Sequence, residues 1–224
     1  MRFAWAVSAC LCASFIASVA TAGAVHGTLW MSSAAAKSPP ASPEAVARIQ
    51  RGIADAVIYV ESIPKKVDEK LARPGGFLFF RSRSSQRVPR ITQNDRKFEP
   101  RVLAIPAGSR VAFINLDSVY HNAFSVSPAK RFDLGKYPPG RRDTLRFDRT
   151  GVVNLHCDIH SSMLGFIVVT PNHAFTRPDS LGNFRLPKLP PGTYSLHVFH
   201  PRRGEVRREV QVPKSGDLLV DLNL

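Results

Sequence analysis

The chain has 224 residues, of which 44% are apolar and 21% charged, and its formal net charge at pH 7 is +14. Nucleic acid is a poor explanation for the positive charge, because none of the known nucleic-acid-binding motifs occurs. Steering of an acidic partner and attraction to anionic surfaces explain the charge about equally well.

The first residues have the pattern of a secretory signal peptide. Arg2 precedes an apolar run over residues 3–20, and small residues near Ala22 offer cleavage sites. We therefore expect residues 1–22 to be removed on export, which leaves the mature protein in the periplasm or otherwise exported. No later segment is apolar enough to span a bilayer, so the mature protein is expected to lack an integral membrane segment.

The next part of the chain predicts a linker and the start of a domain. Residues 23–50 are rich in Ala, Ser and Pro, which is typical of a flexible linker, and Ser42 could cap a short helix at its end. A first domain is expected over residues 51–171. Within it, the apolar run 56–60 predicts a strand and residues 63–72 a short helix.

Short strands broken by turns follow, with either alternating or continuous apolar residues. The predicted strands cover residues 101–105, 110–116, 123–126, 144–147, 152–157 and 165–170. This pattern is typical of an all-β sandwich. Loops cluster at the ends of a sandwich, so ligands far apart in the sequence can meet there.

One of these loops gathers soft metal ligands. Cys157, His160 and Met163 have the spacing Cys-x2-His-x2-Met, and His121 lies 36 residues before the cysteine. Two imidazoles, a thiolate and a weak axial thioether form the ligand set of a type 1 copper site. Removal of the leader would also leave Cys157 as the only cysteine, an exported thiol that metal ligation would protect.

Zinc is the alternative metal. His156 together with His121, Cys157 and His160 provides enough nitrogen and sulfur donors for a tetrahedral site. Strand alternation argues against this arrangement, because it directs His156 to the opposite face from Cys157.

The ligand loop resembles that of the cupredoxins, and its spacing is the one found in amicyanin. The segments 124–134 and 151–166 are also similar to exported plastocyanin-like proteins of the methylamine-utilisation type. This resemblance implies a cupredoxin-like Greek-key β-sandwich with one type 1 copper ion per chain. It further implies that Asn122 ties the two ligand loops together.

The same resemblance implies a surface for electron transfer. The ring edge of His160 would reach the surface, with Pro138, Pro139 and Leu164 supplying apolar contact area around it. We expect an exported carrier of single electrons, with a redox partner that is acidic. Copper storage or delivery, and a structural sandwich with a vestigial site, are the alternatives. A catalyst is not expected, because no His-x-His or His-Cys-His sequence offers a second copper centre.

The last segment, residues 172–224, predicts a second and smaller β unit. Its Gly182-x-Phe184 turn and the Pro-Pro-Gly-x-Tyr turn that ends at Tyr194 resemble the carboxypeptidase regulatory-like, transthyretin-like sandwich. The segment is short for an independent sandwich, and the strand over residues 56–60 is a candidate to complete its sheet.

Overall fold

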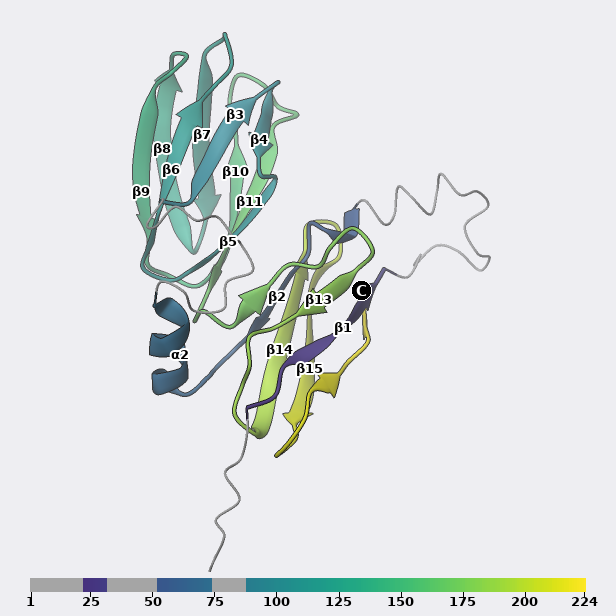
Figure 1. Ribbon diagram of the computed structural model, residues 1–224. Coiled ribbons are helices and arrows are strands. Elements are labelled where there is room, and N and C mark those ends of the chain that lie inside the picture. Colours follow the sequence, from purple (N-terminus) through teal and green to yellow (C-terminus); the bar gives the residue numbers. More distant parts are fainter. Residues whose placement is uncertain (1–21, 32–51, 74–87) are drawn as a thin grey trace, which may run out of the picture.

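The computed structural model describes residues 22–31, 52–73 and 88–224, which form two β-sandwiches and a short helix, α2 (Lys65–Ala72) (Figure 1). The predicted signal peptide and the helix expected after Ser42 lie outside the described residues. Among the described residues, none of the helices is both long and apolar enough to cross a membrane.

The first sandwich is made of two sheets with the strand orders β5-β11-β10-β7-β8 and β4-β3-β6-β9. The first sheet contains β5 (Val102–Pro106), β11 (Leu164–Thr170), β10 (Gly151–His156), β7 (His121–Ser127) and β8 (Lys130–Tyr137). The second contains β4 (Lys97–Glu99), β3 (Arg90–Asn94), β6 (Ser109–Asn115) and β9 (Arg142–Phe147).

Buried and exposed side chains alternate along the strands of this sandwich, and the buried ones fill its core. Val153 and Leu155 of β10 are fully buried, whereas Asn154 between them is exposed. They pack with Phe113 of the opposite sheet in one apolar cluster. The same alternation, continued past the end of β10, brings Cys157 into that cluster.

The second sandwich combines strands from distant parts of the chain. One sheet has the order β12-β2-β14-β15, and the other has β13-β1-β16 with β17 also paired to β1. Its strands are β1 (Val25–Trp30), β2 (Val57–Val60), β12 (Phe175–Thr176), β13 (Asn183–Arg185), β14 (Gly192–His200), β15 (Gly204–Val212), β16 (Leu218–Leu219) and β17 (Leu222–Asn223).

Two strands of the second sandwich come from parts of the chain that the sequence analysis assigned elsewhere. Strand β1 falls within residues 23–50, which were expected to form a flexible linker, and it pairs with three strands near the C-terminus. A Cβ on Gly27 would lie 1.9 Å from the carbonyl oxygen of Val220, so this glycine permits the close approach. Strand β2 falls within residues 51–171 but pairs with β14, as the sequence allowed.

The two sandwiches pack against each other through a small apolar interface. Val57 and Phe199 of the second sandwich contact Val102 and Phe166 on the outer face of the first sheet. The guanidinium of Arg177 donates hydrogen bonds across the interface, to the carbonyl oxygen of Ala54 at 2.5 Å and to that of Val102 at 2.9 Å. These contacts fix the second sandwich beside β5 and β11.

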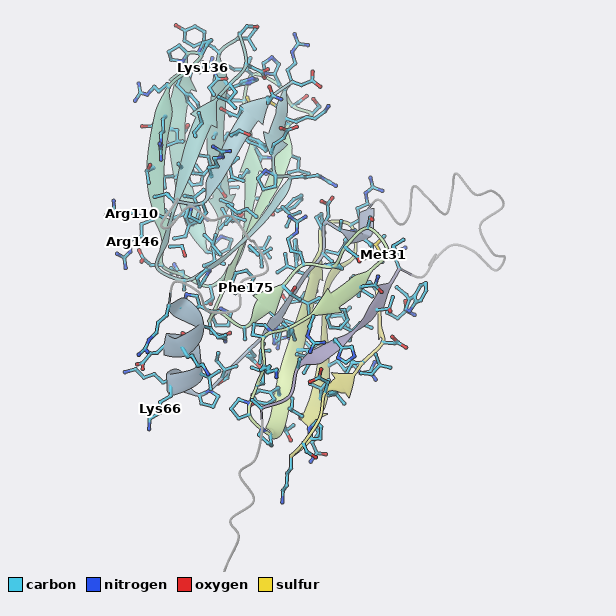
Figure 2. The ribbon with its side chains drawn as sticks, viewed as in Figure 1. Met31, Lys66, Arg110, Lys136, Arg146 and Phe175 are labelled. Carbon is cyan, nitrogen blue, oxygen red and sulfur yellow. The ribbon has the colours of Figure 1, made fainter. Side chains whose placement is uncertain are left out.

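One end of the first sandwich points away from the second sandwich. Lys136, near the end of β8, lies at the end of the molecule that is turned away from the second sandwich (Figure 2). Strand β8 is antiparallel to β7, and Tyr137 pairs with His121. The start of β7 and the end of β10 therefore share this free end.

Candidate metal centre

The predicted ligands come from two chain segments that meet at the free end of the first sandwich. His121 is the first residue of β7, and Cys157 directly follows β10. The two strands are neighbours, with His156 paired to Phe124. The loop after Cys157 is tightened by a hydrogen bond from the Met163 N–H to the His160 carbonyl oxygen, at 3.0 Å.

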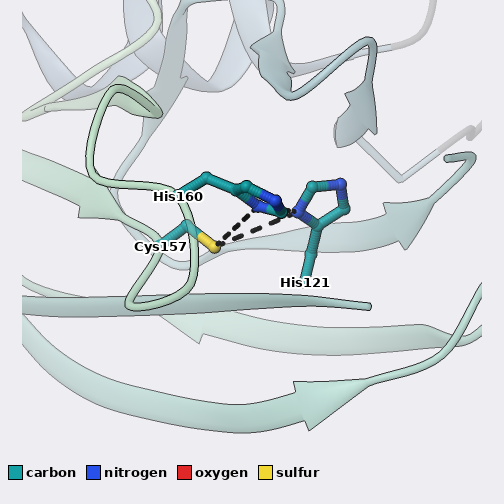
Figure 3. Close-up of side chains that lie close together, drawn as sticks. All are labelled: His121, Cys157 and His160. Atoms are coloured by element: carbon teal, nitrogen blue, oxygen red, sulfur yellow. Dashed lines mark hydrogen bonds between the residues drawn. The ribbon is translucent and has the colours of Figure 1, made fainter. Parts of the chain in front are cut away.

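Three side chains direct their donor atoms to one point (Figure 3). The sulfur of Cys157 lies 4.0 Å from Nδ1 of His121 and 4.0 Å from Nδ1 of His160, and the two nitrogens are 3.2 Å apart. An ion about 2.0 Å from each nitrogen and about 2.3 Å from the sulfur requires donors roughly 3 to 4 Å apart. The observed spacing therefore fits one bound ion.

The chemistry of the three donors fits copper. His121 and Cys157 are buried, with 0% and 4% of their surfaces exposed, and His160 is partly exposed. A thiolate with two imidazoles is the donor set that suits copper in both oxidation states. The group could also hold another metal that accepts nitrogen and sulfur, such as zinc.

A carboxylate fixes the orientation of the His121 ring. Oδ2 of Asp117 lies 2.6 Å from Nε2 of His121, so the ring places its proton on Nε2 and leaves the Nδ1 lone pair free to face Cys157. The backbone N–H groups of Asp95 and Arg96 also donate to Asp117. Burial opposes ionisation of this carboxyl, but the hydrogen bonds outweigh it and hold its pKa below the usual value.

A second set of hydrogen bonds positions the sulfur of Cys157. The backbone N–H of Asn122 donates to Sγ at 3.5 Å, and the Asn122 side chain donates to Asp133 at 2.7 Å. Gln93 of the opposite sheet donates to the Asn122 carbonyl oxygen at 2.9 Å. Asn122 thus lies where it links the two ligand segments, and it is itself held by a side chain from β3.

The remaining candidate ligands differ in position. Met163 is 1% exposed and belongs to the same apolar cluster as Cys157, so its axial role stays a prediction. His156 packs against the ring of Phe124, with centroids 5.5 Å apart, and is not part of the converging group. Its position matches the outward direction expected from strand alternation.

Sequence reasoning missed three residues that lie close to this site. Asp117, Gln93 and Tyr137 have no motif of their own, and each acts from a strand or loop whose position depends on the fold. Tyr137 is 1% exposed, and burial, followed by the nearby charges of Asp143 and Cys157, raises the pKa of its phenol. The only hint in the sequence was that Asp117 lies just four residues before His121.

The two ligand segments carry several exposed apolar side chains. Leu164, one of the residues predicted for this surface, is 39% exposed, Pro138 is partly exposed and Pro139 is exposed. The other large exposed apolar residues of the two ligand segments are Leu116, Val119, Tyr120 and Ile159. We call these four residues together with Leu164 the apolar rim.

No protein-family model and no curated protein matches the chain. Among solved structures, a reduced variant of amicyanin is 24% identical, covers 36% of this chain and 79% of its own, and has a TM-score of 0.34. A purple cupredoxin from Nitrosopumilus maritimus is 26% identical, over 37% of this chain and 99% of its own, with a TM-score of 0.34.

A copper-containing nitrite reductase from Thermus scotoductus is 28% identical, over 46% of this chain and 26% of its own, with a TM-score of 0.37. The predicted fold class is confirmed for the described residues, which are nearly all β and form β-sandwiches with one short helix. The likeness to methylamine-utilisation proteins and the likeness of the second sandwich to carboxypeptidase regulatory-like domains stay predictions.

Proposed function

We propose that this protein is an exported type 1 copper protein that carries single electrons between redox partners. The observation that supports this proposal best is the convergence of the Cys157 sulfur with Nδ1 of His121 and of His160. One bound copper ion per chain would supply one-electron redox chemistry at this point. Met163 is proposed as its weak axial ligand.

The surrounding residues favour rapid electron transfer because they restrict movement of the ligands. Asp117 holds the His121 ring from one side, and the Asn122 N–H holds the Cys157 sulfur from another. Both contacts are built into strands or tight turns, so a change of one unit in metal charge need not rearrange them. A site that is held in this way lowers the energy of reorganisation.

The apolar rim is the proposed contact area for a redox partner. His160 is the ligand with the greatest exposure, so its ring is the shortest route between the buried sulfur and a docked protein. Exposed apolar residues around it allow close approach without costly desolvation of charges. An acidic character of the partner remains part of the proposal, as does export, which depends on the leader pattern in residues 1–22.

Metal analysis and visible spectroscopy of the full mature chain test this proposal. After copper loading we expect about one copper ion per chain and an intense thiolate-to-copper absorption band, reversibly bleached by a one-electron reductant. Cys157→Ser should abolish the band, because a hydroxyl is a poor substitute for a soft thiolate. A chain that binds zinc in preference, or binds copper without the band, would contradict it.

A further inference from the structure

The topology of the first sandwich collects basic residues at the end opposite the candidate metal centre. Arg110, near the start of β6, pairs with Arg146, near the end of β9. Lys130 and Arg131 begin β8, and Arg149 lies in the turn between β9 and β10. A Cβ on Gly151 would lie 3.2 Å from Ala129, so the β7–β8 and β9–β10 turns are in contact.

We call Arg110, Lys130, Arg131, Arg146 and Arg149 the basic end. Figure 2 shows Arg110 and Arg146 together, at the far end of the sandwich from Lys136. Four of the five side chains are exposed and Lys130 is partly exposed. Asp148 brings a carboxylate to this end, and Arg146 pairs with it at 2.6 Å. Within the described residues, no ion pair engages the other four.

The end that carries the candidate ligands is nearly balanced in charge. Residues 88–171 contain 12 basic and 7 acidic residues, and the basic end accounts for most of this excess. Around the ligands, Lys97 pairs with Asp95 and Arg141 with Asp143. Asp117 and Asp158 add negative charge there, which offsets the positive charges of Lys136 and Arg142. The field of the sandwich is therefore strongest on the side away from the proposed copper site.

Among the residues that the structure describes, the basic end also lacks the apolar centre of a typical protein-binding surface. Protein interfaces are usually built around large apolar or aromatic residues. Val126 is the large exposed apolar residue at this end, whereas five such residues form the apolar rim at the other. Unpaired cations without an apolar centre fit a partner that is bound by charge alone.

We propose that the basic end binds the headgroups of an anionic phospholipid bilayer. Each Lys or Arg near such a surface contributes to binding, and the attraction decreases within a Debye length. A protein docked in this way would present the apolar rim to the solvent. The membrane would therefore hold the protein near its surface while the proposed electron-transfer face stays open to a second protein.

Flotation of the mature chain with lipid vesicles tests this proposal. The probe is vesicles of phosphatidylcholine with phosphatidylglycerol, and vesicles of phosphatidylcholine alone serve as the uncharged control. Loss of one cation lowers binding about fivefold, so a variant with Arg110, Lys130, Arg131 and Arg149 changed to Gln should bind at least about a hundredfold more weakly. Added salt should weaken binding of the unaltered chain to a similar extent.

A matched variant separates this surface from the effect of net charge. Lys136, Arg142, Lys188 and Lys214 are exposed, lie outside the basic end and have no ion pair within the described residues. Their replacement by Gln removes the same charge and should reduce binding much less. Equal losses in the two variants would overturn the proposal, as would binding that resists salt, which would indicate an apolar protein-type contact. The assay needs no copper, so its outcome is independent of the proposed electron transfer.

Discussion

Oδ2 of Asp117 lies 2.6 Å from Nε2 of His121, while the other ring nitrogen of His121 faces the Cys157 sulfur. The imidazole therefore bridges a charged carboxylate and the candidate metal position. Because Asp117 also accepts two backbone N–H groups from the β3–β4 turn, the carboxylate cannot rotate away without losing them. The β3–β4 turn thus helps to determine the direction of one ligand lone pair, although it touches neither the ring nor the sulfur.

The first prediction follows from this contact. Asp117→Asn should lower copper affinity about 10- to 100-fold, because a neutral amide orients the ring less firmly and reduces its basicity. Competition with a chelator of known affinity measures the effect. Asp148→Asn is the matched control, since Asp148 pairs with Arg146 at the other end of the sandwich, and it should leave the affinity unchanged.

Met163 gives the second prediction. Met163→Gln should keep copper bound while lowering the reduction potential, because a thioether favours Cu(I) and an amide oxygen does not. Voltammetry of the copper-loaded variant measures the potential. A potential equal to that of the unaltered protein would mean that Met163 fills the core and is not a ligand.

His156 gives the third prediction, which separates the two ligand arrangements left open by the sequence. The side chain lies against Phe124 and outside the converging group, so His156→Ala should leave the visible spectrum nearly unchanged. His160→Ala should alter it strongly. Loss of metal binding in the His156 variant would instead favour a tetrahedral zinc-like site.

Gln93 gives the fourth prediction. Its amide donates to the carbonyl oxygen of Asn122, whose N–H donates to the Cys157 sulfur. Gln93→Leu should loosen that N–H···S contact and lower the reduction potential, since hydrogen bonds to a ligating sulfur withdraw electron density. It should also destabilise the fold by about 1 to 3 kcal/mol, because a buried carbonyl loses its partner.

Thr92→Val is the control for Gln93. Thr92 precedes it on β3 and donates to the carbonyl oxygen of Glu99, away from the ligands. This variant should lose stability without a change in potential. Equal potentials for both variants would show that Gln93 contributes only to packing.

The fifth prediction concerns pH and His200, at the interface side of β14. Burial lowers the pKa of this imidazole, which is 1% exposed. Nε2 donates to the Gly52 carbonyl oxygen at 2.8 Å, and Nδ1 accepts the Arg202 N–H at 3.2 Å. The neutral ring satisfies both bonds.

The direction of the pH effect follows from the lowered pKa. As pH falls below about 6.5, the unfolded chain takes up a proton on His200 before the folded chain does. The free energy of unfolding should therefore decrease below that pH, and His200→Gln should show a smaller decrease. Denaturant titrations above and below this pH measure how the free energy of unfolding changes with pH in the unaltered protein and in the variant. If the variant and the unaltered protein lose stability equally as the pH falls, His200 is not the source of the pH dependence.

The sequence predicted the ligands better than it predicted their support. Cys157 and His160 share one short loop, and alternation along β10 is local, so both could be placed before the structure was known. Gln93 depends on the packing of two sheets, which no local pattern describes. Strand β1 was missed because Gly27 interrupts the apolar face formed by its buried residues Val25 and Leu29, and because its partners lie about 160 to 190 residues later.

The pairing of β1 also determines an order of assembly during synthesis. The first sandwich is contiguous from β3 to β11, so all of its strands are available before the last quarter of the chain is made. The second sandwich must wait, because β1 emerges first and its neighbours β13, β16 and β17 emerge last. The first sandwich is thus an insertion within the second. Until β13, β16 and β17 have been synthesised, the edges of β1 are unpaired and could pair with the wrong strand.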